Sequence, residues 1–120
     1  MVEKGKPEAK WSLPPVFQRF YLFAGWVLDR VEKFPKSARF TFGQRMTDLT
    51  LGILENLVRA AYGRRRTDSL EAANTRLEVL RVMIRLSKDR HYLSFRQYEF
   101  ASGELLEIGK MIGGWLKSRK

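Results

Sequence analysis

Apolar residues recur in steps of three and four along four long segments of this chain, and that spacing constrains the fold more than any other feature. In the first segment the apolar positions are Phe17, Phe20, Ala24, Val27, Val31 and Phe34. An α-helix completes a turn every 3.6 residues, so side chains at this spacing lie on one side of a helix. Similar stripes occur in the later segments, and no segment is patterned as a clear β-strand. The sequence therefore predicts an all-α protein.

Proline and glycine mark the ends of the first two predicted helices. The first helix begins near Val16 and stops before Pro35, because the residue that precedes a proline disfavours the α conformation. The second helix begins within residues 37–41 and ends at Tyr62, with Gly63 as its C-terminal cap. Only a few residues separate these two helices.

Two capping boxes, each a polar side chain followed three residues later by Glu or Gln, mark the expected starts of the last two helices. Asp68 with Glu71 opens the third helix, which ends near residues 89–91. Ser94 with Gln97 opens the fourth helix, which continues to the basic C-terminus. Short loops between long helices make neighbouring helices antiparallel, so we expect an antiparallel up-down four-helix bundle.

The 120 residues suit a single domain with a substantial core, since 44% of them are apolar. We expect residues 1–15, which mix charges with prolines, to form a flexible tail and residues 16–120 to form the bundle. The sequence contains no cysteine, no apolar leader segment and no apolar run that approaches the length of a membrane span. These features indicate a cytoplasmic protein without a membrane partner.

Cations dominate the charged residues, with 23 lysines and arginines against 13 acidic residues and a net charge of +10. This balance favours binding to nucleic acid, although a basic run is often only a solvated surface. The cations gather beside the proline break, in the predicted loop at residues 64–66, and on the polar arc of the third helix. Side chains in that loop need not support the core. The residues expected to contact phosphates are Lys36, Arg39, Arg45, Arg64, Arg65, Arg66, Arg81, Arg85 and Lys88.

Three predicted helices carry more apolar surface than one small core requires. The third helix is apolar over an unusually wide arc, and Leu51, Leu54 and Val58 make the second helix similarly broad. In the first helix, Leu22 and Trp26 form an exposed pair opposite the core stripe. A squat bundle with wide buried faces would explain the arc, and a second copy of the chain would explain it as well. We expect a homo-oligomer. The residues expected at an oligomer or partner contact are Leu22, Trp26, Val79, Val82, Met83 and Leu86.

Patterns that would indicate catalysis or metal binding are missing from the sequence. His91 is the only histidine and there is no cysteine, which excludes paired Glu-x-x-His di-metal sites and zinc sites of these residues. His91 stands next to a helix end, and no phosphate-cradling glycine motif occurs. Glu104 and Glu107 share the polar side of a helix, where we interpret them as a solvated pair. We expect a protein that is not an enzyme and that uses no cofactor or metal.

Several stretches of the chain resemble one known family. The resemblance extends through most of the chain from residue 16 onward, and it is carried mainly by two motifs. These are Phe34-Pro35-Lys36-x-x-Arg39-Phe40-Thr41-x-Gly43-Gln44-Arg45 and Ile108-Gly109-x-Met111-x-Gly113-Gly114-Trp115-Leu116. In both, the chain resembles the accessory variability determinant proteins, which are small four-helix partners of reverse transcriptase in diversity-generating retroelements.

This resemblance implies properties that composition alone does not. It implies a basic homopentamer that binds the retroelement reverse transcriptase and its template RNA in support of mutagenic cDNA synthesis. Separately, contacts to phosphates alone predict that the protein also binds DNA non-specifically. Two alternatives remain open. One is a self-assembling bundle of the type encoded in intervening sequences of ribosomal RNA genes, which shares the Phe34-Pro35-Lys36-x-x-Arg39 start and has no reverse transcriptase partner. The other is a basic amphipathic membrane binder, which the spread of cations over a compact bundle disfavours.

Overall fold

A computed structural model of the chain describes residues 13–118, and all the regular structure in that range is helical. The expected all-α class is thereby confirmed. The elements are α2 (Pro15–Glu32), the short α3 (Lys36–Ala38), the π-helix η1 (Arg39–Gly43), α4 (Gln44–Tyr62), α5 (Arg66–Asp89) and α6 (Phe95–Ser118). The expected N-terminal tail falls mostly on residues 1–12, which lie outside the described residues.

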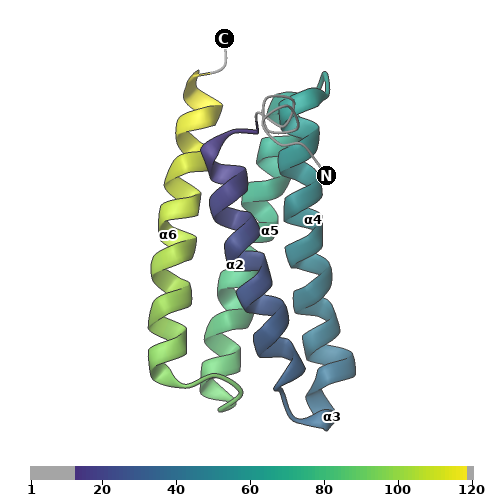
Figure 1. Cartoon of the computed structure of the whole chain (residues 1–120), viewed down its shortest axis with the longest axis vertical. Helices are drawn as coiled ribbons and strands as arrows, with labels where there is room; N and C mark the ends of the chain where they lie inside the picture. The colour runs from purple at the N-terminus through teal and green to yellow at the C-terminus, as the bar shows by residue number, and fades with distance from the viewer. Residues whose placement is uncertain (1–12, 119–120) are drawn as a thin grey trace, which may run out of the picture.

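The four long helices lie side by side and successive helices run in opposite directions, as in a four-helix bundle (Figure 1). Each long helix contacts two others, since α2 packs on α4 and α6, and α5 packs on the same two helices. The end of the bundle that holds α3 also holds the loop between α5 and α6. The loop between α4 and α5 lies at the opposite end, together with the C-terminal end of α6. No helix within residues 13–118 combines the length and the hydropathy needed to cross a membrane.

The predicted stripes form the core. In α2 the stripe from Phe20 to Phe34 is buried, while Phe17 is only half-buried at its start. Burial of a large aliphatic or aromatic side chain stabilises the fold by about 1.5–3 kcal/mol, so the stripes supply the main driving force. The largest side chains with almost no exposed surface come from all four helices and the proline break: Phe20, Phe34, Met46, Ile53, Leu57, Leu70, Leu77, Leu80, Ile84, Leu105, Ile108 and Ile112.

The proline break closes one end of the core. Phe34 is 1% exposed, and its ring lies 5.2 Å from that of Tyr92 and 6.4 Å from that of Phe42, measured between centroids. After Pro35 the chain winds through α3 and the wider π-turn η1 before α4 begins. Gly43 permits this path, because a Cβ atom there would lie 2.8 Å from Cγ1 of Val31. The break therefore folds back against α2.

The helix ends follow the expected signals in three cases and depart from them in one. The Ser94 hydroxyl accepts from the backbone N–H of Gln97 at 3.1 Å, and Gln97 Oε1 accepts from the N–H of Ser94 at 2.9 Å. This reciprocal pair is the expected capping box. Gly63 caps α4 as expected, with its N–H donating to the Arg59 carbonyl at 2.7 Å. Pro35 likewise follows the end of α2.

The expected capping box of Asp68 and Glu71 is wrong. α5 begins at Arg66, and the residue before it, Arg65, caps the helix without a side-chain hydrogen bond. Asp68 instead lies in the first turn, where its carboxylate accepts from Arg65 Nε at 2.9 Å. A negative charge in the first turn also interacts favourably with the positive end of the helix dipole. Asp68 therefore stabilises the start of α5 as a residue of its first turn and not as its N-cap.

His91 has a backbone role at the end of α5. Its φ of 67° is the only positive φ among the described residues. The N–H of His91 donates to the Lys88 carbonyl at 3.0 Å, and the N–H of Tyr92 donates to the Ser87 carbonyl at 2.8 Å. These two bonds make a Schellman motif with histidine at the left-handed position that glycine usually occupies. The His91 side chain is exposed, so this residue contributes to the turn through its backbone.

Candidate nucleic-acid interface

Apart from Arg81, which lies within α5, the cations predicted to contact phosphates divide between the two ends of the bundle. Ser87 Oγ lies 3.5 Å from Met46 Sδ, so the last turns of α5 adjoin the first turns of α4. We therefore group Lys36, Arg39, Arg45, Arg85 and Lys88 as the α3 end of the molecule. Residues 64–66 form the arginine loop at the opposite end (Figure 1). In a molecule of 42 × 37 × 23 Å, these cations form two separate basic regions.

At the α3 end, Lys36 and Arg45 are exposed and make no ion pair with any described residue. Arg39 is half-buried against the proline break, and one of its terminal nitrogens donates to the Phe34 carbonyl at 3.3 Å. Its Nε is buried without a hydrogen-bond partner among the described residues. Arg39 is thus anchored to the fold, while Lys36 and Arg45 remain available to solvent.

The basic arc of α5 is only partly exposed. Arg81 Nε donates to Glu78 at 3.0 Å, and another guanidinium nitrogen donates to the Leu105 carbonyl of α6 at 3.3 Å. Lys88 Nζ lies 4.7 Å from the centroid of the Tyr98 ring on α6. Long cationic side chains often cover a helix seam in this way, with their stems on apolar surface. Arg85 is exposed and makes no ion pair with a described residue.

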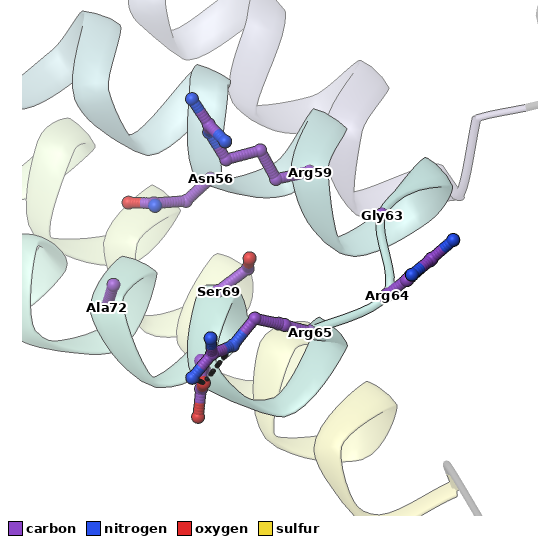
Figure 2. A pocket seen from close by; sticks show the side chains of 8 residues that line it. Asn56, Arg59, Gly63, Arg64, Arg65, Ser69 and Ala72 are labelled. Atoms are coloured by element: carbon purple, nitrogen blue, oxygen red, sulfur yellow. Dashed lines mark hydrogen bonds and ion pairs between the residues drawn. The ribbon is translucent and has the colours of Figure 1, made fainter.

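The arginine loop contains three different environments. Arg64 is exposed and points away from the helices (Figure 2). Arg65 is paired with Asp68. Arg66 is the first residue of α5, where its Nε donates to the Ala60 carbonyl at 2.9 Å and its guanidinium lies 5.7 Å from the Trp115 ring centroid. The expectation that these side chains do not support the fold is therefore wrong for Arg66, because it joins the start of α5 to α4 and α6.

A groove of about 530 Å³ lies between α4 and α5 beside the arginine loop. Figure 2 shows Asn56 and Arg59 on the α4 side and Ser69 and Ala72 on the α5 side. Arg59 pairs with Glu55 at 2.7 Å. Asn56 is only 9% exposed, and its Oδ1 accepts from Arg76 at 2.8 Å. The remaining lining residues are Gly63, Arg64, Arg65 and Asp68.

Sequence reasoning did not identify the groove residues Asn56, Arg59 and Ser69. A usable signal exists only for Asn56, which follows Ile53 by three residues and so places a side-chain amide on the buried side of α4 beside Leu57. Arg59 looks like an ordinary exposed partner of Glu55. Ser69 has no distinctive sequence context. The groove depends on the crossing of α4 and α5, which the spacing of apolar residues does not specify.

The residues expected at an oligomer or partner contact differ in exposure. Leu22, Val82 and Leu86 are 69%, 63% and 43% exposed, whereas Val79 and Met83 are half-buried. The interpretation of Trp26 as exposed is wrong: its ring stacks on Phe23 at 5.7 Å and contacts Phe100 of α6 at 5.1 Å. Trp26 lies on the flank of α2 that faces α6, so it covers that seam. Leu51 and Val58, which broaden the apolar arc of the second predicted helix, are exposed as well, and so are Tyr21, Phe100 and Leu106.

Glu104 and Glu107 on α6 have different partners and different roles. Glu104 accepts two hydrogen bonds from Arg19 of α2, each of 3.0 Å, while Glu107 pairs with Lys110 at 3.5 Å. Hydrogen bonding to the Glu104 carboxylate raises the pKa of the Arg19 guanidinium above its ordinary value. A two-point contact of this kind fixes the relative position of the two helices. The expected solvated pair is therefore wrong for Glu104, which joins α2 to α6.

The site chemistry consists of cations, amide and hydroxyl donors, and apolar surface. Within residues 13–118 no group of three or more His, Cys, Asp or Glu side chains is placed to hold a metal ion.

Neither a search of curated proteins nor a search of solved structures found a significant match. A family model described as bAvd-like matches residues 16–119, a range that includes almost every element described above. The chain therefore belongs to the bAvd-like family.

Proposed function

We propose that this chain is a non-catalytic accessory protein that binds a retroelement reverse transcriptase and its template RNA, and thereby supports mutagenic cDNA synthesis. The observation that carries the proposal is membership of the bAvd-like family over residues 16–119. The motif resemblance at the proline break and near the C-terminus points to the same role. The proposed place of action is the cytoplasm, a reducing compartment in which a chain without cysteine needs no disulfide.

RNA binding is proposed to use the exposed cations at both ends of the bundle. Lys36, Arg45 and Arg85 at the α3 end and Arg64 in the arginine loop are exposed and make no ion pair with any described residue. Arginine forks bind phosphate oxygens regardless of base sequence, so DNA is expected to bind as well. An RNA strand that contacts both regions would follow the length of the bundle.

Assembly into a ring is proposed from the placement of the exposed apolar side chains, and a homopentamer from the family resemblance. Val82 and Leu86 lie on the outer side of α5. On α4, Gly52 and Asn56 face Arg76 of α5, so Leu51, about a third of a turn away from both, lies on another flank. Two different apolar surfaces favour a head-to-tail contact, which can close into a ring, over a two-fold dimer that uses one surface twice.

Co-purification with the reverse transcriptase of a diversity-generating retroelement, with and without its template RNA, tests the proposed role. We expect a stable complex and cDNA synthesis that depends on the chain. His91→Asn serves as the control for a catalytic role, because asparagine tolerates the left-handed conformation that His91 adopts. That variant should support cDNA synthesis at the unaltered level.

Two results would contradict the proposal. A chain that assembles and binds RNA but never binds reverse transcriptase would favour the ribosomal intervening-sequence type of bundle. Loss of cDNA synthesis in a folded His91→Asn variant that still binds RNA and reverse transcriptase would instead favour direct participation in the chemistry.

A further inference from the structure

The groove between α4 and α5 contains hydrogen-bond donors that the fold does not use. We propose that this groove is a subsite for a single phosphate group, in which Asn56, Ser69 and the neighbouring arginines donate to the phosphate oxygens. The inference rests on the proposed function in one respect, namely that the phosphate belongs to a nucleic acid. It adds a defined position at which the strand is held.

The orientation of the Asn56 amide follows from its neighbour. Arg76 has only donors, so the Asn56 atom that it contacts at 2.8 Å must be the oxygen. The Nδ2 group must then be directed elsewhere, and the structure gives it no acceptor among the described residues. Asn56 is more than nine-tenths buried and lines the groove. The Nδ2 atom is not among the fully buried side-chain atoms without a partner, so it is open to the groove and can donate to a ligand oxygen there.

Ser69 presents a second donor from the opposite wall. Its hydroxyl points toward α4 in Figure 2 and makes no hydrogen bond with any described residue. Asn56 and Ser69 thus come from different helices and border the same space. Donors offered by two walls of one groove can bind different oxygens of the same phosphate group.

Three arginines supply the charge around these donors. Arg59, Arg64 and Arg65 line the groove, against a single lining carboxylate, Asp68. The partners of Arg59 and Arg65 are the carboxylates of Glu55 and Asp68, whose side chains are 62% and 61% exposed. Exposed ion pairs contribute little to stability, so both guanidinium groups can turn toward a bound anion at small cost.

The dimensions favour a phosphate within a larger molecule. A volume of about 530 Å³ exceeds that of a lone phosphate and leaves room for the adjoining sugars. The same donors would accept a backbone phosphodiester, a terminal phosphate or free phosphate. The phosphate group is their shared chemistry, and the experiment separates these sources.

The decisive variant is Asn56→Asp. The aspartate keeps the shape of the side chain and an oxygen for Arg76, but it replaces the Nδ2 donor by a negative oxygen. Asn74→Asp, which makes the same change on the side of α5 that faces α6, is the matched control. Ser69→Ala, which removes only an unpartnered hydroxyl, is a second variant that keeps the fold. Thermal melting verifies that each variant is folded.

The assay uses three probes: inorganic phosphate, and a short single-stranded oligonucleotide with either a 5′-phosphate or a 5′-hydroxyl. Inorganic phosphate should shift the side-chain NH₂ signals of Asn56 in the ¹H–¹⁵N NMR spectrum in a saturable manner. Asn56→Asp should weaken oligonucleotide affinity about tenfold or more, and Ser69→Ala about threefold. Asn74→Asp should change it about twofold or less, because salt screens a distant charge.

The pattern of losses identifies the source of the phosphate. Equal losses for both oligonucleotides indicate a backbone phosphate, and a loss confined to the 5′-phosphorylated strand indicates a terminal one. An Asn56→Asp variant that binds all three probes like Asn74→Asp overturns the subsite, even if RNA binding itself is confirmed. Conversely, binding of inorganic phosphate at Asn56 without any oligonucleotide binding keeps the subsite and contradicts the proposed nucleic-acid function.

Discussion

Individual arginines in this protein serve either the fold or the solvent-facing surface, and the hydrogen-bond partner decides which. Arg19 joins α2 to α6 through Glu104, and Arg66 joins the start of α5 to the Ala60 carbonyl. Arg45, Arg64 and Arg85 make no ion pair with any described residue and are exposed. A substitution in the first group should change the free energy of unfolding, whereas a substitution in the second should change polyanion binding.

Arg66 and Arg64 provide a direct test, because they lie two residues apart in one basic run. Arg66→Ala should lower the free energy of unfolding by about 1–2 kcal/mol, since it removes a charged hydrogen bond to a carbonyl and the contact with Trp115. Arg64→Ala should change it by less than about 0.5 kcal/mol. Urea denaturation followed by circular dichroism measures both, and equal effects would refute the structural role of Arg66.

At the scale of elements, the proline break determines how α2 meets α4. The π-turn η1 brings Gly43 against Val31, and the rings of Phe34, Phe42 and Tyr92 pack together beside it. A π-turn widens the helix by one residue and shifts the register of the residues that follow. Here it carries the chain from the break into a straight α4 while Phe34 stays buried.

Gly43→Ala tests that close approach. The added Cβ would lie 2.8 Å from Val31 Cγ1, a distance at which one of the two must move. Overpacking of this kind should lower the free energy of unfolding by about 1–3 kcal/mol. The double variant Gly43→Ala with Val31→Ala should be less destabilised than the sum of the two single variants, because the second change removes Cγ1. Strict additivity in urea denaturation would show that the two residues do not compete for space.

Gly25→Ala is the matched control for this measurement. Gly25 lies inside α2, and a Cβ atom there would have no other atom within 4 Å. The substitution should therefore raise the free energy of unfolding by about 1 kcal/mol, in line with helix propensity alone.

The sequence predicted the elements well because their signals are local. The spacing of the apolar residues, together with the proline and glycine breaks, located four helices. The capping pair of Ser94 and Gln97 joins residues only three positions apart in the chain. Predictions about Trp26 and Arg66 failed because the partners, Phe100 and Ala60, belong to other helices. The α4–α5 groove was missed for the same reason. The packing of the bundle decides which cations donate to backbone carbonyls, and the order of residues in the chain does not specify that packing.

At the scale of the molecule, the exposed cations and the exposed apolar side chains coincide only in part. Lys36, Arg45 and Arg64 lie toward the two ends of the bundle, and Leu22, Leu51 and Val82 lie along the helices. Phe40, Tyr62 and Phe95 are also exposed near the ends. A ring formed through Leu51 and Val82 would leave Lys36, Arg45 and Arg64 open to solvent. This arrangement suits a basic protein that assembles and still binds RNA, because contacts between copies then do not bury these unpaired charges.

Val82→Asp tests the assembly. Val82 is 63% exposed, so the substitution should preserve helix content and the melting transition of the protomer. If the outer side of α5 contacts another copy, a buried aspartate there should convert the oligomer to monomers at micromolar concentration. Ser37→Asp, at an exposed polar position of α3, is the control and should keep the oligomer. Light scattering coupled to gel filtration gives the masses, and a monomeric wild-type protein would contradict the proposed ring.

Neutralisation of exposed cations at each end tests whether both basic regions contact RNA. Arg45→Gln and Arg85→Gln change the α3 end, Arg64→Gln changes the arginine loop, and Lys110→Gln removes one charge that is paired with Glu107 on α6. Wild-type RNA affinity should fall about a thousandfold between low and moderate salt, and loss of one phosphate contact should reduce the salt slope by roughly 0.7–0.9. Each of the first three variants should show that reduction, and Lys110→Gln should not.

Because the two ends are far apart, the losses from Arg45→Gln and Arg64→Gln should add in the double variant. Unchanged slopes at one end would restrict the RNA path to the other, and unchanged slopes at both would refute phosphate contact by these residues.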